Sequence, residues 1–527
     1  MGYAHTHDAN PHWLPRLPRT ATDDIPGTDG WPLVGTTFEQ LKDPHAFTRK
    51  MAATYGPIYR VRSFGGRTVQ LLGPEANELV LFDRDKLFSS EQGWGPILNL
   101  LFPRGLMLMD FEQHRVHRRT LSVAFKPEPM KLYCEALNDG IARRLKDWSG
   151  KKFEFYAAIK ALTLDLAATS FLGIPWGPEA DRINQAFVDM VQASVGVVRI
   201  PIPGTKMAKG VAGRAYLKDY FGREVPKRRA SDAQDMFSQI CRATNEDGSL
   251  LSDDEIIDHM NFLMMAAHDT ITSSATSMVM LLGQNPEWQD TLRDEMLGLG
   301  LAGNDLPYDR LNDLVLTDYA FKESLRLMAP VPSIPRRAVK DFDFGGYHFK
   351  AGTYVGISPA FTHKMPEYWP EPEKFDPLRF EPEQVKARHK YAWVPFGGGA
   401  HMCLGLHFAY MQIKILMWHL LRDQRIVLPS GSGASWQAWP IPKPRDGLPV
   451  QIADPDPQQR GRHEQRHGEL GGNGVDSFHR PVAPEERRSI AAEAVTAMHN
   501  DIEAAVAAGA TASRVAAWGP WPPRLPS

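Results

Sequence analysis

The chain has 527 residues, which is enough for one large domain or for several of average size. Its formal net charge of -2 argues against the basic excess on which nucleic-acid-binding proteins depend. Three cysteines, Cys134, Cys241 and Cys403, are too few for a disulfide framework and favour a reducing compartment. The sequence has no run of ~18 apolar residues and no apolar stretch at its N-terminus, so it predicts neither a transmembrane segment nor a signal peptide. We expect a cytoplasmic protein, or one that is peripheral to a membrane.

The N-terminal part of the chain predicts an arm followed by a hairpin. Residues 1–24 are polar and rich in proline, which predicts an extended arm, and structure is expected from residue 25 onward. Residues 57–73 (PIYRVRSFGGRTVQLLG) alternate as two strands of a β-hairpin around Gly65 and Gly66. Two helical patterns follow, over 111–125 and 130–148.

The longest predicted helix covers 252–285. Ser252 is expected to cap it with Glu255 in a capping box, and the helix should end before Pro286. A further helix over 316–328, short strands over 342–358, a proline-rich loop and an apolar helix over 404–420 follow. The sequence therefore predicts a mainly α chain with a smaller β-rich region.

The C-terminal residues 454–527 have a different composition. The stretch PDPQQRGRHEQRHGELGGNG has too few apolar groups to pack, which predicts a mostly disordered tail. Within it, residues 484–508 fit one amphipathic helix that ends at Gly509. We favour a weakly docked appendage over a partner-binding helix.

The segment PFGGGAHMCLGLHF (395–408) places Cys403 in a glycine-rich turn before an apolar helix, and two interpretations of it fail on spacing. A dinucleotide loop is excluded because Met402 stands where the third glycine belongs. A zinc site from His401, Cys403 and His407 lacks the second cysteine that structural zinc usually recruits. A third interpretation, a buried and inert thiol, is the usual state of a free cysteine and is preferred for the other two.

The fourth interpretation is a thiolate ligand to haem iron. The positive dipole end of the following helix favours an ionised Cys403 sulfur. Gly399 and Gly405 remove side chains where a flat macrocycle must lie against the backbone, and glycine permits the turn that points amides at the sulfur. Phe396 can pack on the ring, and His401 can reach an anionic propionate. A single axial thiolate favours O–O cleavage.

These five positions resemble, in type and spacing, the haem-binding signature of the cytochrome P450 (haem-thiolate) family. They are Phe396, Gly399, His401, Cys403 and Gly405. The resemblance covers roughly 25–453 and implies the fold of that family, a triangular, mainly helical single domain with a smaller β-rich region. It also implies that haem b (iron protoporphyrin IX) lies between the long helix and the loop of Cys403, its axial ligand.

A pair and a later arginine extend the resemblance. Glu323 and Arg326 lie on one helix face, as in the Glu-x-x-Arg pair that the family carries behind the haem. Arg379 in FDPLRF (375–380) is similar to the second arginine motif, which implies a bond to that pair in a buried network. Alone, such a pair is usually a solvated surface pair.

The centre of the long helix resembles the oxygen-binding segment of the family. Ala266 and Ala267 would leave room for dioxygen, although the family usually has glycine at the second position, which leaves the local widening of the helix open. The Thr270 hydroxyl can turn toward the carbonyl of the previous turn and can donate to the distal oxygen. The adjacent Asp269 can relay protons from solvent.

Three basic side chains resemble the propionate partners of the family. His114 and Arg118 are four residues apart and fall on one helix face. Arg336 stands where the family places another propionate arginine, although Arg337 beside it leaves the register open. The arginines that directly follow His114 and Arg118 should face elsewhere, toward solvent or a redox partner.

The resemblance implies a monooxygenase that inserts one atom of O2 into a C–H bond or a double bond, with protons delivered through Thr270 and Asp269. Electrons would come from a ferredoxin or flavodoxin and its NAD(P)H-dependent reductase, since three cysteines exclude a four-cysteine iron–sulfur cluster. Two alternatives stay open: a peroxygenase or isomerase with the same fold, and a haem-binding sensor or carrier.

The substrate is expected to be lipophilic: a sterol, a terpenoid or a fatty acid. Two apolar segments, 94–109 and 331–335, occupy regions that line the pocket in this family, and pockets are mostly apolar. The segments IPGTDGWPLVG (25–35) and HKMPEYWPEPEKFDPLRF (363–380) resemble the sterol- and retinoid-processing branch of the family more than the camphor-type branch. The candidate pocket residues are Trp94, Leu98, Leu101, Met107, Val331 and Ile334. The alternative is that the first segment only packs on haem.

Overall fold

A computed structural model provides the structure of the chain. It describes residues 13–15, 17–32, 34–63, 66–194, 196, 200–433, 435–438 and 440–454. The predicted helix over 484–508, the tail from residue 455 and residues 1–12 of the predicted arm lie outside the described residues.

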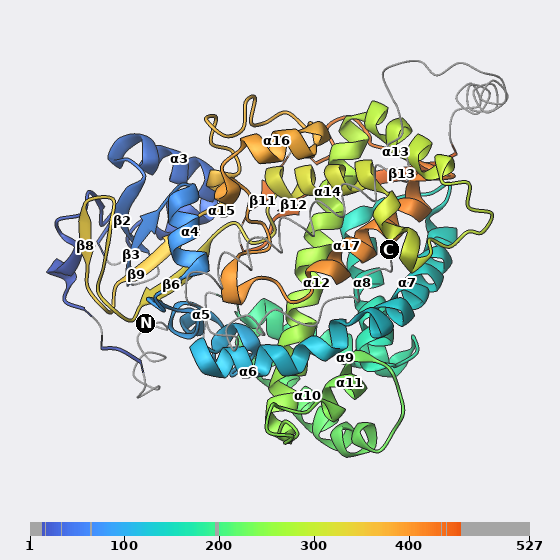
Figure 1. Cartoon of the computed structure of the whole chain (residues 1–527), viewed down its shortest axis with the longest axis horizontal. Helices are drawn as coiled ribbons and strands as arrows, with labels where there is room; N and C mark the ends of the chain where they lie inside the picture. The colour runs from blue at the N-terminus through green and yellow to red at the C-terminus, as the bar shows by residue number, and fades with distance from the viewer. Residues whose placement is uncertain are drawn as a thin grey trace, which may run out of the picture. The chain divides into compact units, whose positions relative to one another are not determined.

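Helices make up most of the described chain, as the sequence predicts (Figure 1). Their bounds are α2 Thr37–Lys42, α3 Pro44–Tyr55, α4 Pro74–Phe82, α5 Ser90–Leu98, α6 Phe111–Leu121, α7 Pro127–Trp148, α8 Phe155–Leu172, α9 Pro178–Ser194, α10 Lys206–Arg229, α11 Met236–Arg242, α12 Asp253–Gln284, α13 Pro286–Gly298, α14 Val315–Leu327, α15 Pro359–Thr362, α16 Pro382–Ala387 and α17 Leu406–Leu421.

The strands form small sheets, the largest with six strands in the order β1-β2-β3-β9-β6-β4. The strand bounds are β1 Gly27–Thr28, β2 Ile58–Ser63, β3 Gly66–Leu71, β4 Phe88–Ser89, β5 Lys152–Glu154, β6 Ile334–Ala338, β7 Phe342–Phe344, β8 Tyr347–Phe349, β9 Tyr354–Ile357, β10 Arg425–Val427, β11 Trp436–Gln437, β12 Lys443–Pro444 and β13 Pro449–Ala453. A three-stranded sheet has the order β10-β13-β5, and β7-β8 and β11-β12 are two-stranded.

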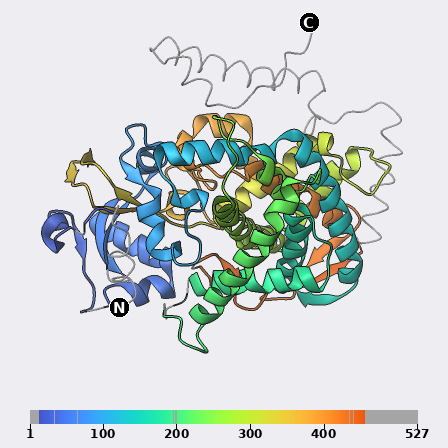
Figure 2. The same cartoon turned by 90° about the horizontal axis from the view of Figure 1, so that it is seen from below.

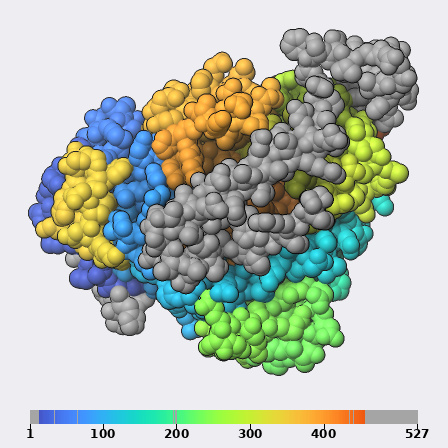
Figure 3. All heavy atoms as spheres, in the orientation of Figure 1, coloured from blue at the N-terminus to red at the C-terminus, as the bar shows by residue number. Residues whose placement is uncertain are grey.

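The predicted hairpin over 57–73 is confirmed as the antiparallel pair β2–β3, in register from Ile58 opposite Leu71 to Ser63 opposite Gly66. Strand β9 then pairs in parallel with β3, and β6 pairs antiparallel with β9. The sheet therefore brings β6, from a distant part of the sequence, beside the N-terminal strands. In Figure 3 the β7–β8 hairpin, in yellow, lies beside these blue N-terminal elements.

Helix α12 runs through the interior, with α8, α10, α14 and α17 packed against it. Figure 2 views α12 nearly end-on, with other helices around it. The predicted capping box is confirmed: Ser252 accepts from the Glu255 N–H, and the Glu255 carboxylate accepts from the Ser252 N–H. The predicted helix over 316–328 is also confirmed, as α14.

Residues of the predicted arm that the structure describes pack against α5. Trp13 is buried and donates from Nε1 to Glu91 Oε1 at 3.1 Å. Its ring occupies the place of a side chain at Gly95, where a β-carbon would lie 2.4 Å from the ring. A short 3-10 helix, Arg19–Thr22, follows, so this part of the arm is anchored.

Helix α8 is the one described helix long and apolar enough to cross a membrane by length and composition, and 61% of it is buried inside the protein. Phe155, Ile159 and Leu162 belong to the largest hydrophobic cluster. This burial is typical of a core helix.

Candidate active site

Cys403 lies in the loop between the 3-10 helix Gly399–His401 and α17. Its backbone N–H donates to the Phe396 carbonyl at 2.9 Å. The backbone N–H of Gly405 faces the Cys403 sulfur and acts to lower the pKa of its thiol. The turn thus points an amide at the sulfur, a contact that stabilises a thiolate ligand.

The Cys403 thiol is accessible although protein surrounds it, whereas Cys134 and Cys241 are buried. Burial raises the pKa of the Cys403 thiol, while the Gly405 N–H and the Arg118 charge act in the opposite direction. An accessible sulfur in dense surroundings faces a hollow inside the protein. A metal cation there would replace the proton, because metal ligation deprotonates a thiol.

Gly399 has a reason for being glycine that differs from the one expected. Its φ is +58°, in the left-handed region. A β-carbon there would lie 2.3 Å from the Leu81 carbonyl oxygen and 2.9 Å from Phe82 Cα, both in α4. The close approach is therefore to α4. At Gly405, by contrast, a β-carbon would make only an ordinary contact with Phe125.

Four basic side chains gather near this loop. His114 and Arg118 come from one face of α6, and the His114 and His401 ring centroids are 3.9 Å apart. The charge of Arg336, from β6, reaches both imidazoles. Burial and these neighbouring charges lower the pKa of His114 to about 4, and burial lowers the pKa of Arg336 to about 10.

Within the described residues, neither Arg118 nor Arg336 forms an ion pair with a carboxylate of the chain. Arg336 donates to the Pro335 carbonyl at 2.9 Å, and the nearest acidic charges, Asp83 and Asp110, act on it without contact. A buried cation without a counter-ion is costly. The buried Arg336 and the half-buried Arg118, beside two imidazoles, are therefore suited to a ligand that carries carboxylates.

The structure settles which of the two adjacent arginines faces this cluster. Arg337 donates to the Gln92 side chain and to the Gly352 and Pro15 carbonyls. Because successive residues of a strand point to opposite faces, Arg336 is left on the face toward His114.

The arginines that follow the propionate candidates are exposed, as predicted. Arg115 pairs with Glu112 and Glu246, and Arg119 also pairs with Glu246. Their charges are therefore largely balanced within the chain, which weakens the expectation that they receive a redox partner.

Helix α12 is buried along most of its length, but its centre is partly accessible. Residues 256–264 and 271–282 are buried, whereas Ala266, Ala267, Asp269 and Thr270 are half-buried, as is Met265. An interior helix with an accessible middle faces a hollow. The Thr270 hydroxyl donates to the Ala266 carbonyl at 2.7 Å, the orientation that the sequence predicts.

Asp269 has a partner that sequence reasoning missed. Lys160 of α8 donates to Asp269 Oδ1 at 3.3 Å, and His268 Nδ1 lies 3.2 Å from the same oxygen. Lys160 and Asp165 are the charged residues of the apolar helix α8, and Asp165 pairs with Arg144. A charge in an apolar helix was the available signal, although it names no partner.

Glu323 and Arg326 form a fully buried pair on α14. Arg326 Nε donates to Glu323 Oε2 at 2.6 Å and Nη2 donates to Oε1 at 2.8 Å. Arg379 Nε lies 3.4 Å from Glu323 Oε1, which also accepts from the Asp376 N–H. The structure thus brings the three predicted network residues together.

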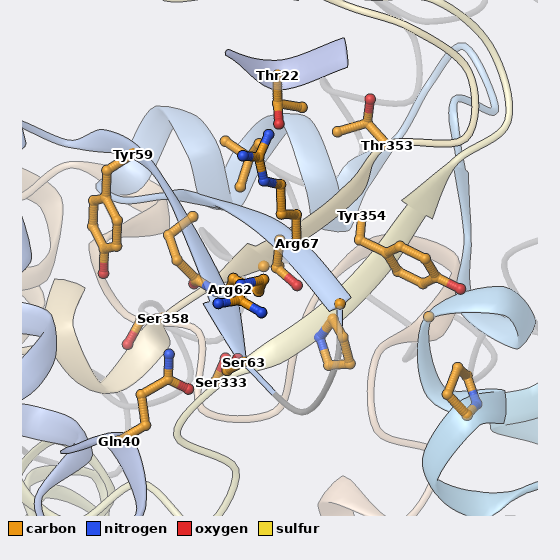
Figure 4. Close-up of a pocket in the computed structure, with 18 of the residues that line it drawn as sticks. Thr22, Gln40, Tyr59, Arg62, Ser63, Arg67, Ser333, Thr353, Tyr354 and Ser358 are labelled. Carbon is orange, nitrogen blue, oxygen red and sulfur yellow. The ribbon is translucent and has the colours of Figure 1, made fainter. Parts of the chain in front are cut away.

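A cavity of about 500 Å³ lies between the six-stranded sheet, α5 and the segment before β6 (Figure 4). Of the predicted pocket residues, Trp94 lines it, next to Ile97 and Ser333. The other predicted residues are not among its walls: Leu98, Leu101 and Ile334 are buried, and Met107 and Val331 are half-buried. Figure 4 shows that its polar lining includes Arg62, Arg67 and Tyr354.

The fold and this site define a haem-thiolate protein, and comparison with known proteins agrees. The family model for cytochrome P450 matches residues 25–435. Cytochrome P450 136 of Mycobacterium tuberculosis is 36% identical over 82% of this chain and 89% of its own. Taxane 10-beta-hydroxylase of Taxus cuspidata is 29% identical over 81% of this chain and 89% of its own.

Solved structures give the same answer. A retinoic acid-bound cyanobacterial CYP120A1 matches with a TM-score of 0.75 and 29% identity over 82% of this chain and 99% of its own. The chain belongs to the cytochrome P450 family, has its fold and is a monooxygenase of that family. The accessible sulfur, the unpaired basic cluster and the accessible middle of α12 fit the haem that the family carries.

Proposed function

We propose that the protein inserts one oxygen atom of O2 into a lipophilic substrate, with electrons from a ferredoxin or flavodoxin-type partner and its NAD(P)H-dependent reductase. We place this activity in a domain over 25–453 and in the cytoplasm. The observation that carries the proposal is the accessible Cys403 thiol with its Gly405 amide. When bound, haem supplies the oxygen-activating iron.

The chain would hold haem from both sides. Cys403 would ligate the iron, and Phe396 would pack near the ring. His114, Arg118 and Arg336 would neutralise the haem propionates, which explains why these basic groups cluster without carboxylates.

Proton delivery is proposed for Thr270 and Asp269, whose side chains are half-buried at the accessible middle of α12. The Thr270 hydroxyl now donates to the Ala266 carbonyl and would turn to donate to dioxygen. Asp269 would receive protons from the solvent side, where Lys160, with 25% of its side chain exposed, holds the carboxylate. The presence of this acid–alcohol pair favours monooxygenation over a peroxygenase or an isomerase.

The proposed substrate class is a terpenoid, sterol or fatty acid. The named ligands of two relatives, a taxane and retinoic acid, are largely apolar molecules. The apolar residues Met265, Ala266 and Ala267 at the accessible middle of α12 support the same class. Screening these three classes for a change in haem spin state would identify the substrate.

Cys403→Ser is expected to abolish the red-shifted Soret band that carbon monoxide gives with a reduced haem-thiolate protein, because a serine oxygen is not a thiolate. The measurement is the difference spectrum of the reduced protein with and without carbon monoxide. Cys241→Ser, which changes a buried cysteine elsewhere, is the control and should keep the band. Persistence of the band in Cys403→Ser would refute the ligand assignment.

Thr270→Ala is expected to uncouple electron consumption from product. Without its hydroxyl, proton delivery slows, and product per electron pair should fall about tenfold or more while peroxide rises. Thr272→Ala is the matched control, because its hydroxyl also bonds the previous turn, at 2.9 Å to the His268 carbonyl, but is buried. Equal coupling in the two variants would remove Thr270 from the mechanism.

A further inference from the structure

Two buried imidazoles join α6 to α12 outside the site described above. His117 Nδ1 and His259 Nε2 are 2.8 Å apart, and the ring centroids are 5.0 Å apart. His259 is fully buried and His117 is 7% exposed. Neither residue is a haem contact in the proposed function, on which the following inference rests.

The buried surroundings select one arrangement of protons. In the described part of the chain, His259 Nδ1 is buried and has no hydrogen-bond partner. A buried N–H without an acceptor is rare and costly, so the proton of His259 belongs on Nε2. His259 Nε2–H then donates to His117 Nδ1, and His117 carries its own proton on Nε2.

Glu255 supports this arrangement from the start of α12. His117 Nε2 lies 3.6 Å from Glu255 Oε1, so the N–H of His117 faces a carboxylate. The other oxygen of Glu255 is held by the capping box, accepting from the Ser252 N–H at 2.8 Å. The three side chains therefore form an ordered row, Glu255, His117 and His259.

The row joins two helices that hold different parts of the haem. On α6, His117 stands between His114 and Arg118, the proposed propionate partners. On α12, His259 precedes Ala266 by about two helical turns and Thr270 by about three, and so shares their face. A change in the spacing of α6 and α12 at this point would move the propionate partners relative to the oxygen-binding residues.

We propose that the hydrogen bond from His259 to His117, oriented by Glu255, is a positioning contact that sets how tightly α6 and α12 hold the haem. A proton added to His117 Nδ1 would place two N–H groups against each other and break the bond. Haem retention should therefore weaken in acid through this row. The other charged or titratable groups that act on the row are His114 of α6 and Arg104 of the loop before it.

The test is the rate at which haem passes from the holoprotein to an excess of apomyoglobin, measured from pH 5 to pH 8. His259→Leu removes the donor and should speed haem loss about 10–100-fold at neutral pH, the usual effect of losing a contact that orients a cofactor's partners. His259→Gln keeps an N–H at the position of Nε2 and should release haem close to the unsubstituted rate.

A double variant separates this role from simple packing. The double variant H117N/H259Q replaces His117 by asparagine, which keeps an acceptor, and His259 by glutamine, which keeps a donor. Neither amide side chain titrates. This variant should hold haem at pH 8 and show a smaller acid acceleration of haem loss than the unsubstituted protein, because the other histidines with lowered pKa values remain. His419→Leu is the control, because it removes another imidazole, half-buried and bonded to Asn138, and should not change haem release.

Three results would overturn the proposal: slow haem loss from His259→Leu, equally fast loss from His259→Leu and His259→Gln, or an unchanged acid acceleration in the double variant. The carbon monoxide spectrum of each variant is recorded in parallel. A normal thiolate band with any of these results would refute the positioning role and leave the proposed function intact.

Discussion

Replacement of Arg326 by lysine is expected to prevent folded, haem-loaded protein from accumulating. The Arg326 guanidinium and the Glu323 carboxylate are fully buried and meet in two hydrogen bonds. Lysine lacks the planar fork and cannot hold both oxygens. Breaking a buried ion pair costs about 3–5 kcal/mol. That cost is a large fraction of the stability of a typical protein, about 5–15 kcal/mol.

The guanidinium also supports the chain that leads toward the cysteine loop. It donates to the backbone carbonyls of His363, Pro372 and Lys374 at 3.0, 2.7 and 3.1 Å. Its loss would leave these carbonyls short of a donor as well as Glu323 short of a partner. For this reason the replacement of both members of the pair by leucine should not restore full stability.

The measurement is the yield of soluble protein with the carbon monoxide band, together with the free energy of unfolding in urea. Arg223→Lys is the matched control, since Arg223 pairs with Asp219 on α10 at 2.9 Å with both side chains more than half exposed. An exposed pair contributes about 0–1 kcal/mol, so the control should behave as the unsubstituted protein. An Arg326→Lys protein that unfolds like the control would contradict the role of the network.

Features with a local signal were predictable from the sequence. The β2–β3 hairpin follows from alternation, and α12 begins at Ser252 because its side chain and that of Glu255 satisfy exposed N–H groups. The Thr270 hydroxyl bonds within its own helix, so its orientation was predictable as well. Each of these needs only neighbours a few residues away.

Contacts between distant segments were predictable only where family motifs marked both partners, as for Glu323 and Arg379. Lys160 meets Asp269 across 109 residues, and His117 meets His259 across 142. These pairs depend on how helices pack, which periodicity does not specify. The cavity beside Trp94 likewise has walls from β2, β3, β9 and α5. Trp94 is the one predicted pocket residue that lines it.

The conformational reason for Gly399 shows the same limit. The sequence identified the position correctly as one that needs glycine, but the contact that requires it is with Leu81 and Phe82 of α4. A motif can mark a position without stating which part of the chain approaches it.

Acidification from pH 7 to pH 5 is expected to destabilise the protein strongly through histidines whose pKa is lowered by burial. Burial lowers the pKa of His259 and His363 to about 3, and of His268 and His419 to about 4. An exposed histidine in the unfolded chain has a pKa of about 6.5, so the unfolded state binds more protons below that value.

Acidification therefore lowers the free energy of unfolding. The stability that comes from keeping these imidazoles neutral is present above about pH 6.5 and is lost as the pH falls toward their folded values. Each histidine should lose about 2 kcal/mol between pH 7 and pH 5, and the four together about 8 kcal/mol. Buried carboxyl groups whose pKa is raised by burial, such as Glu323, act in the opposite direction and reduce the net change.

Urea unfolding of the holoprotein at pH 7, 6 and 5 measures the effect, and His419→Gln tests its source. The His419 Nε2–H donates to Asn138 Oδ1 at 3.0 Å, a bond that glutamine can keep without titrating. The variant should match the unsubstituted protein at pH 7 and lose about 2 kcal/mol less on acidification to pH 5. Because His419 lies near the end of α17, away from the cysteine loop, a smaller loss in this variant would trace the acid sensitivity to imidazoles whose pKa is lowered by burial. An identical loss in both proteins, or none, would contradict it.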